Sequence, residues 1–358
     1  MISRERVLLA LNHIEPDRVP FFYRDVPEAE FHVLKELGLS SRDELLEYLG
    51  VDFRWVGPGY VGPKLFDPET GIKRDIWGIE YKYVKLGERN GYWETVSNPL
   101  AECKSVEELE EYEWPRVEWF DFSVVTEKVR KYKDYAIMTE PGFASPSLFQ
   151  CPVQGLLGQE RAFMDVISDS EFFEAMVEKV LEFQLPFIDM MLEAGGGRID
   201  LFRIGDDFGT QRGLLMSPVQ WRKALRPGLK AMCELAENHH AHIYMHSCGA
   251  VRDLIPDLLE LGVEVLDPLQ VTAHGMVPAE LKEAYGDKLC FSGGVDEQHL
   301  LREGDERAVC ESVVELLDDM AKGGGFFIGP THNFEADIPV GNILAMYRAA
   351  GDWSQSNY

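Results

Sequence analysis

Basic residues are scarce in this chain of 358 residues, which has 35 lysines and arginines against 62 aspartates and glutamates. The formal net charge of −27 at pH 7 opposes nucleic-acid binding, because phosphate recognition needs a positive surface. The same charge opposes adsorption to an anionic membrane. We therefore expect neither a nucleic acid nor a membrane among the partners of this protein.

Long apolar runs and paired cysteines are also lacking. No stretch reaches the roughly 18 consecutive apolar residues that a membrane span needs. The basic start of the chain is followed by only five apolar residues, too few for the core of a signal peptide. The six cysteines are scattered and none forms a C-x-x-C pair. This pattern is typical of reduced thiols and predicts a cytoplasmic protein.

Several cofactor and catalytic signatures are absent as well. Residues 57–62, GPGYVG, have the glycine spacing of a dinucleotide site, but the turn-rich PKLFDPETG follows them. A pyrophosphate site needs the N-terminus of a helix at that point. The glycines at 292–294 and 323–325 precede no Walker-type lysine, and no G-x-S-x-G elbow presents a serine nucleophile. We interpret these glycines as tight turns.

Short apolar runs alternate with amphipathic stretches along most of the chain. The runs are at 51–56, 135–142, 199–207, 241–249, 263–270, 288–296 and 325–332. The amphipathic stretches include 171–194, 218–239, 253–261 and 305–322. This alternation predicts an α/β fold with a parallel sheet. The number of repeats favours a (β/α)8 TIM barrel, with an open doubly wound sheet as the alternative.

Residues 66–97 have a different sequence pattern, in which polar and apolar residues alternate and residues typical of turns interrupt the alternation. This pattern predicts an antiparallel β insertion near the N-terminus. Because an α/β barrel can use this many residues, we expect residues 1–358 to form a single domain.

Polar residues occur at the C-terminal end of nearly every predicted strand. They are Glu140, Asp206, Asp207, His246, Cys248, Asp267, Gln270, Asp296 and His332. Because these strand ends meet at one mouth of a barrel, the pattern predicts an active site there. We expect Asp206 and Asp207 to be catalytic, through acid–base work or orientation of the substrate. Gln270 and Asp296 are expected to contact the substrate.

Aromatic residues near the same strand ends are candidates for a substrate pocket. Tyr60 and Phe143 are the two that we assign to substrate binding, and Phe149, Phe208 and Phe334 are further candidates. Such residues would suit a pocket for an aryl ether as substrate. Aromatic side chains at strand ends, however, more often pack in the core.

The run AHIYMHSCG, 241–249, contains the strongest candidates for metal ligands. Side chains alternate along a strand, so His246 and Cys248 are expected to share the inward face, while Ile243 and Met245 face the helices. A histidine nitrogen and a cysteine thiolate in this arrangement can bind the same Zn²⁺ ion. The alternative is a hydrogen-bonded core histidine beside a small buried cysteine.

His332, on the same predicted rim, is the third candidate ligand. Three protein ligands with a fourth position open describe a catalytic zinc site, whereas a structural site closes all four positions. One of Asp206 and Asp207 is the candidate for a fourth zinc ligand.

Several segments together resemble the uroporphyrinogen decarboxylase superfamily. They are RERVLLALNHIEPDRVP, GDDFGTQRGLLMSPVQWRKALRPGLK (205–230), HSCG, FSGGVD and GPTHNFEADIPVGNI. The similarity runs nearly the full length of the chain. It implies a (β/α)8 barrel with its site at the C-terminal mouth, often as a homodimer.

True uroporphyrinogen decarboxylases differ from this sequence at two segments. They have an arginine-rich segment that grips the carboxylates of the substrate, and an essential aspartate after the next strand. Here the corresponding segments are FFYRDVPEAE (21–30), where only Arg24 resembles those arginines, and WVGPGYVG (55–62), which has no aspartate. A highly anionic porphyrinogen would also meet Asp206 and Asp207.

The corrinoid-linked methyltransferases of the superfamily are closer. They bind zinc through a His-x-Cys, which His246 and Cys248 match, and through a later cysteine, where this chain has His332. The loss of one thiolate makes the metal less electron-rich and favours Lewis-acid behaviour. This resemblance implies methyl transfer between a small thiol, ether or amine and a corrinoid. The corrinoid is expected on a separate carrier protein, because the chain has no D-x-H-x-x-G signature.

Two other functions stay open at this point. One is a metal-independent decarboxylase or lyase of a small acid, in which Asp206, Asp207 and His246 perform acid–base work. The other is a barrel that binds a ligand or partner without chemistry, because a fold does not determine a function.

Overall fold

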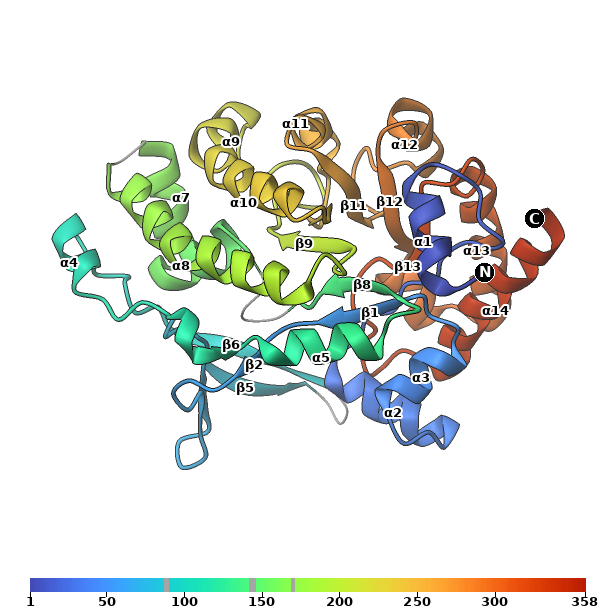
Figure 1. Cartoon of the computed structure of the whole chain (residues 1–358), viewed down its shortest axis with the longest axis horizontal. Coiled ribbons are helices and arrows are strands. Elements are labelled where there is room, and N and C mark those ends of the chain that lie inside the picture. The colour runs from blue at the N-terminus through green and yellow to red at the C-terminus, as the bar shows by residue number, and fades with distance from the viewer. Residues whose placement is uncertain (87–89, 142–145, 169–170) are drawn as a thin grey trace.

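Seven parallel strands form one curved sheet in the computed structural model, which describes residues 1–86, 90–141, 146–168 and 171–358 (Figure 1). In spatial order they are β1 (Phe53–Val56), β8 (Ala136–Thr139), β9 (Leu201–Gly205), β10 (His242–His246), β11 (Val263–Leu269), β12 (Cys290–Val295) and β13 (Phe326–Pro330). Each corresponds to one of the predicted apolar runs, so the predicted strands are confirmed.

Residues 20–25 fill the gap between the two edges of this sheet. The Phe22 N–H donates to the Ile328 carbonyl of β13 at 2.8 Å, and the Ile328 N–H donates to the Pro20 carbonyl at 3.0 Å. On the other side, the Asp52 N–H donates to the Phe21 carbonyl at 3.0 Å, next to β1. The segment therefore acts as an eighth strand, and the predicted TIM barrel is confirmed.

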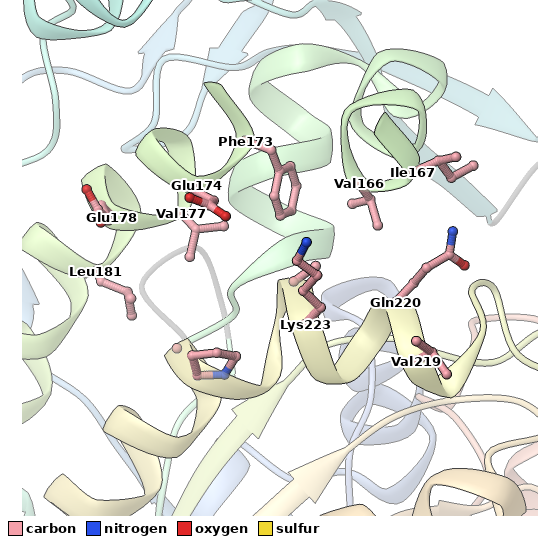
Figure 2. Close-up of a pocket in the computed structure, with 13 residues that line it drawn as sticks. Val166, Ile167, Phe173, Glu174, Val177, Glu178, Leu181, Val219, Gln220 and Lys223 are labelled. Atoms are coloured by element: carbon pink, nitrogen blue, oxygen red, sulfur yellow. The ribbon is translucent and has the colours of Figure 1, made fainter. Parts of the chain in front are cut away.

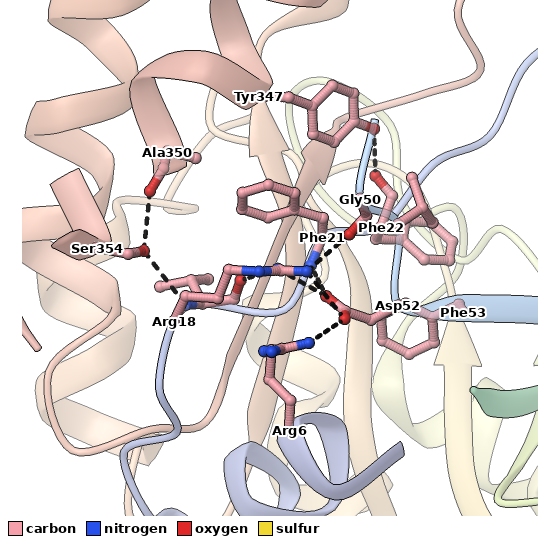
Figure 3. A network of polar contacts seen from close by, with 12 residues as sticks. Arg6, Arg18, Phe21, Phe22, Gly50, Asp52, Phe53, Tyr347, Ala350 and Ser354 are labelled. Carbon is pink, nitrogen blue, oxygen red and sulfur yellow. Dashed lines mark hydrogen bonds and ion pairs between the residues drawn. The ribbon is translucent and has the colours of Figure 1, made fainter. Parts of the chain in front are cut away.

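The Asp52 carboxylate holds this closing segment in place (Figure 3). Asp52 is fully buried and its Oδ2 accepts hydrogen bonds from the Phe21 N–H and from Arg18 Nη1, both at 2.8 Å. Its Oδ1 accepts from Arg6 Nη1 at 2.7 Å and from Arg18 Nη2 at 3.1 Å. The Asp52 side chain therefore adds an acceptor for the Phe21 N–H to the backbone hydrogen bonds that join this segment to β1 and β13.

The two faces of the strands are packed as the alternation predicts. Tyr244 lies inside the barrel with Phe22, Phe53 and Phe327, while Ile243 and Met245 belong to the larger core between the sheet and the helices. Val7, Ala10 and Leu11 of the first helix pack against the inner cluster, so this helix closes the N-terminal end of the barrel.

Helices cover the outside of the barrel (Figure 1). They are α1 (Ser3–Leu11), α2 (Pro27–Leu37), α3 (Arg42–Tyr48), α4 (Val106–Glu110), α5 (Ser123–Lys131), α6 (Gly155–Leu157), α7 (Gln159–Ser168), α8 (Glu171–Gly195), α9 (Pro218–Ala224), α10 (Arg226–Asn238), α11 (Ile255–Glu260), α12 (Pro278–Tyr285), α13 (Glu306–Met320) and α14 (Val340–Asn357). The stretch expected as one amphipathic segment at 218–239 is divided between α9 and α10 at Leu225, because Pro227, in the first turn of α10, has no N–H to continue the hydrogen-bond ladder of α9. None of the helices in the described ranges has both the length and the apolarity of a bilayer span.

The insertion predicted at 66–97 is an antiparallel sheet. Its strands, in order, are β3 (Phe66–Asp67), β4 (Ile72–Arg74), β5 (Glu80–Leu86) and β6 (Asn90–Ser97). A separate pair joins β2 (Gly59–Tyr60) to β7 (Phe120–Asp121). The GPGYVG segment thus leads into a short strand and not into the helix that a dinucleotide site would need.

The closure of the barrel yields a stability prediction. We expect Asp52→Asn to lower the free energy of unfolding by about 3–5 kcal/mol, because it removes the buried carboxylate that pairs with Arg18 and shares Arg6 with Asp17. A urea titration that gives the midpoint and the slope measures the effect. Asp17→Asn is the matched control, since Asp17 also bonds Arg6 but its side chain is 41% exposed; its cost should be about 0–1 kcal/mol. Equal midpoints for the two variants would contradict the role of Asp52.

Candidate metal centre

The HSCG segment ends β10 at the mouth of the barrel. The strand register places His246 level with Gly205 of β9 and Asp267 of β11, so residues just beyond these strand ends are its neighbours. Gly249 has a φ of 90°, and a Cβ atom there would lie 2.5 Å from the backbone of Gly209. Only glycine fits at this position, and it lets the HSCG loop pack against the loop that contains Asp207.

Three candidate ligands converge at this mouth. The ligand atoms of Asp207, His246 and Cys248 all lie within 4.8 Å of one another. His246 Nε2 is 3.6 Å from Cys248 Sγ and 3.8 Å from Asp207 Oδ1. The Cys248 N–H donates to Asp207 Oδ1 at 2.8 Å, and Gln150 Nε2 donates to Asp207 Oδ2 at 2.9 Å. Asp207 is therefore held in place from two sides.

His246 is oriented by a buried carboxylate behind it. Its Nδ1 lies 2.6 Å from Asp267 Oδ2, which also accepts a hydrogen bond from Arg24 Nη1 at 2.7 Å. An ionised carboxylate at this distance keeps the ring proton on Nδ1, so the lone pair of Nε2 faces Cys248 and Asp207. Arg24 Nη2 donates to the Thr331 carbonyl at 2.8 Å, and this links the closing segment to the loop after β13. A carboxylate behind a ligating histidine is the usual outer partner in zinc sites.

The protonation states follow from burial and from these partners. Burial opposes the ionisation of Asp267, but Arg24 and His246 outweigh it and hold the pKa of Asp267 well below its usual range. Burial, and next Arg203, lower the pKa of His246. Burial, and next the charge of Asp207, raise the pKa of the Cys248 thiol. The site without metal therefore holds a neutral imidazole and a protonated thiol.

His332 lies close enough to these groups to be affected by their charges. Burial, followed by Arg24 and His246, lowers the pKa of His332 to about 4. The imidazole of His332 is therefore neutral at physiological pH. Within the described ranges, however, the group whose ligand atoms meet within 4.8 Å contains Asp207 and not His332. His332 as a zinc ligand stays a prediction.

The two neighbouring aspartates have different surroundings. Asp206 is fully buried and accepts hydrogen bonds from the Ser147 hydroxyl and from three backbone N–H groups, those of Leu148, Phe149 and Gln150. It fixes the start of the short π-helix at Phe149–Gln154 and with it Gln150, the partner of Asp207. Asp206 is thus placed to support the site, while Asp207 faces it.

The residues expected to bind substrate are found in separate places. Gln270 accepts a hydrogen bond from the Gly249 N–H at 2.6 Å and supports the HSCG loop. Asp296 caps the short π-helix at Glu297–Leu301 by accepting three backbone N–H groups. Tyr60 donates to the Pro63 carbonyl at 2.9 Å beside the insertion. Phe143 lies outside the described residues. A direct contact of any of these with substrate stays a prediction.

The further aromatic candidates, Phe149, Phe208 and Phe334, are all fully buried. They pack against Phe163, Trp221 and Tyr23, respectively. These three therefore form part of the core.

A cavity of about 510 Å³ with a largely apolar lining lies away from this centre, between α7, α8, α9 and the start of α10 (Figure 2). Val166, Phe173, Val177 and Leu181 are on its walls. It contains none of the predicted ligands or acid–base residues, so the chemistry that the sequence predicts is not located there.

Comparisons with known proteins agree with the barrel fold. The family model described as uroporphyrinogen decarboxylase (URO-D) matches residues 95–353. No curated protein matches the sequence. Among solved structures, a methyltransferase from Methanosarcina mazei is similar over 98% of this chain and 99% of its own, with a TM-score of 0.65 and 20% identity. D-psicose 3-epimerase from Clostridium cellulolyticum H10 is similar over 70% of this chain and 86% of its own, with a TM-score of 0.39 and 12% identity. The first of these likenesses supports the barrel fold over the whole chain.

The carboxylate behind His246 yields a prediction for metal affinity. We expect Asp267→Asn to weaken Zn²⁺ binding by about 10–100-fold, because the amide no longer fixes the proton on Nδ1. Competition with a chromophoric chelator measures the dissociation constant. Asp257→Asn is the control, since Asp257 is also a buried carboxylate paired with an arginine, Arg222, but it lies on α11. An unchanged zinc affinity in Asp267→Asn would show that Asp267 does not act through His246.

Proposed function

This chain belongs to the uroporphyrinogen decarboxylase family, and we propose that it is a zinc-dependent methyltransferase. It moves a methyl group between a small thiol, ether or amine and a corrinoid carried by a partner protein. The observation that carries the proposal is the convergence of Asp207, His246 and Cys248 at the mouth of the barrel. The fold that the chain shares with the Methanosarcina mazei methyltransferase gives it further support.

The donor set fits Zn²⁺. Nitrogen and sulfur ligands at about 2.0 and 2.3 Å from one tetrahedral ion lie about 3.5 Å apart, and His246 Nε2 and Cys248 Sγ are 3.6 Å apart. A soft sulfur beside an imidazole disfavours Mg²⁺ and Ca²⁺, which prefer oxygen ligands. Burial and the charge of Asp207 raise the pKa of the Cys248 thiol, and the charge of Arg24 opposes them only in part. A divalent ion would stabilise the thiolate form of Cys248.

Zinc in this site would supply Lewis acidity, which lowers the pKa of a bound thiol or polarises an ether or amine leaving group. The side chains of the protein provide the remaining functions. Asp267 fixes the ring of His246, and Gln150 fixes the carboxylate of Asp207. His332, neutral because its pKa is about 4, provides a further ligand or a hydrogen bond to the substrate.

The position of Arg24 favours methyl transfer over decarboxylation of a porphyrinogen. Arg24 is the residue that resembles the substrate-gripping arginines of the decarboxylases. Its guanidinium is buried and donates to Asp267 and to the Thr331 carbonyl. It is therefore engaged within the protein and is poorly placed to grip the carboxylates of a substrate.

Metal content is the first test of this function. We expect about one zinc per chain in the native protein and its loss in Cys248→Ala, because the variant removes the thiolate ligand. Elemental analysis of the purified proteins measures both. Cys310→Ala is the control, since Cys310 lies on α13 and contacts the Ala345 carbonyl; it should retain the metal.

The outcome separates the candidate functions. Absence of zinc in the native protein, even after supplementation, would contradict the proposal and favour a metal-independent lyase. A zinc-containing protein is then assayed with methyl donors and a corrinoid carrier. Turnover that does not depend on the carrier would indicate a zinc lyase.

The third ligand has its own test. We expect Asp207→Asn to weaken zinc binding more than His332→Ala does, because Asp207 is the residue whose oxygen meets the other two ligand atoms. Competition titrations of both variants against the native protein give the ranking. The reverse ranking would assign the third position to His332, as the sequence predicts.

A further inference from the structure

A second cavity, of about 540 Å³, lies between the insertion sheet and the C-terminal rim of the barrel. We call it the rim cavity. Its wall on the insertion side includes Tyr83 of β5 and Trp93 of β6, and its wall on the barrel side includes Glu28, Glu297 and Glu335. These three glutamates begin α2 and follow β12 and β13, respectively, so the cavity is beside the mouth of the barrel.

Two aromatic rings form a corner of the rim cavity. Tyr83 and Trp93 are directly paired across β5 and β6, and their ring centroids are 5.4 Å apart with an angle of 66° between the planes. The two side chains are 39% and 38% exposed, so both rings are accessible to a ligand. The pair is of the edge-to-face kind, in which the electron-poor edge of one ring meets the electron-rich face of the other, and both rings border the cavity.

A cation of the protein already lies over the face of the Trp93 ring. Lys73 Nζ of β4 lies 5.2 Å from the centroid of the Trp93 ring, which is within the range of a cation–π interaction. This ammonium group marks the place where a ligand cation would bind. Because Lys73 is on a short strand of the insertion and its side chain is long, it can move away when a ligand enters.

The opposite wall is acidic. Glu28 accepts a hydrogen bond from the Tyr83 hydroxyl at 3.2 Å, and Glu297 is buried and paired with Arg302 at 2.8 Å. Burial, followed by the charge of Glu297, raises the pKa of Glu335. Arg302 also lies 3.5 Å from Asp337, so one arginine serves several carboxylates on this side. The lining of the rim cavity thus has three carboxylates, those of Glu28, Glu297 and Glu335, against the two cations Arg302 and Lys73, and the excess of carboxylates is what a ligand cation would offset.

We propose that the rim cavity binds a small organic cation through an alkylammonium group. Trp93 and Tyr83 contact the methyl groups, and the carboxylates of Glu28 and Glu335 face the positive charge. Neutral ligands of the same shape lack the electrostatic part of this attraction, and anionic ligands are repelled by the acidic wall. The proposal rests on the rim cavity alone and holds whether or not the metal centre transfers methyl groups.

Choline and its neutral isostere 3,3-dimethyl-1-butanol test the proposal by calorimetric titration into the full-length protein at constant ionic strength. We expect choline to bind with a dissociation constant in the millimolar range and the isostere to bind at least about tenfold more weakly. Equal binding of the two compounds, or no choline binding up to about 100 mM, would overturn the proposal.

Variants of the protein locate the site. Trp93→Ala should weaken choline binding about tenfold, and Lys73→Met should strengthen it, because it removes the competing ammonium from the ring. The Lys73 variant keeps the ring in place and remains informative if loss of Trp93 disturbs the hairpin. Cys248→Ala should leave choline binding unchanged, which separates this site from the metal centre. Choline binding that neither Trp93→Ala nor Lys73→Met alters would place the ligand elsewhere and refute the proposal.

Discussion

A buried carboxylate reinforces the closure of the barrel, and the geometry of the candidate metal centre depends on that closure. Asp52 binds the Phe21 N–H, Arg6 and Arg18 and so holds residues 20–25 between β13 and β1. The same segment carries Arg24, which bonds Asp267, and Asp267 in turn orients His246. A chain of charged hydrogen bonds therefore extends from the closing segment to the candidate ligands. A misplaced closing segment would leave Asp267 without its cation and His246 without a fixed tautomer.

Most of the barrel could be predicted from the sequence, because buried parallel strands are continuous apolar runs separated by amphipathic helices. The eighth strand could not. Residues 20–25 contain a proline and charged residues, and they join the barrel through a side chain and a few backbone hydrogen bonds. The contact of Arg24 with Asp267 spans 243 residues of sequence, and no local pattern indicates such a pairing.

The candidate site was predictable to a similar degree. The strand period predicts that His246 and Cys248 share one face; in the structure β10 ends at His246, and the loop that follows brings the Cys248 side chain to it. The strand period does not predict which of Asp206 and Asp207 faces the candidate ligands. Both residues lie beyond the end of β9, so the conformation of the loop sets the direction of their side chains. In the structure the loop buries Asp206 under the Ser147–Gln150 backbone and turns Asp207 toward the ligands. Loop geometry also determines whether His332 or Asp207 lies nearer to the His246–Cys248 pair, and sequence spacing alone does not specify it.

The large negative charge of the chain bears on both proposed sites in the same direction. A net charge of −27 repels polyanions, and around a concave mouth it raises the local concentration of cations. Zn²⁺ and an alkylammonium group are both cations, and each proposed site places carboxylates next to softer partners. At the metal centre these partners are an imidazole and a thiol, which are typical zinc ligands. In the rim cavity they are aromatic faces, which bind large, weakly hydrated cations without coordinating them. The overall negative charge therefore favours cations in general. The side chains beside the carboxylates, an imidazole and a thiol at one site and aromatic rings at the other, determine which cation each site would bind.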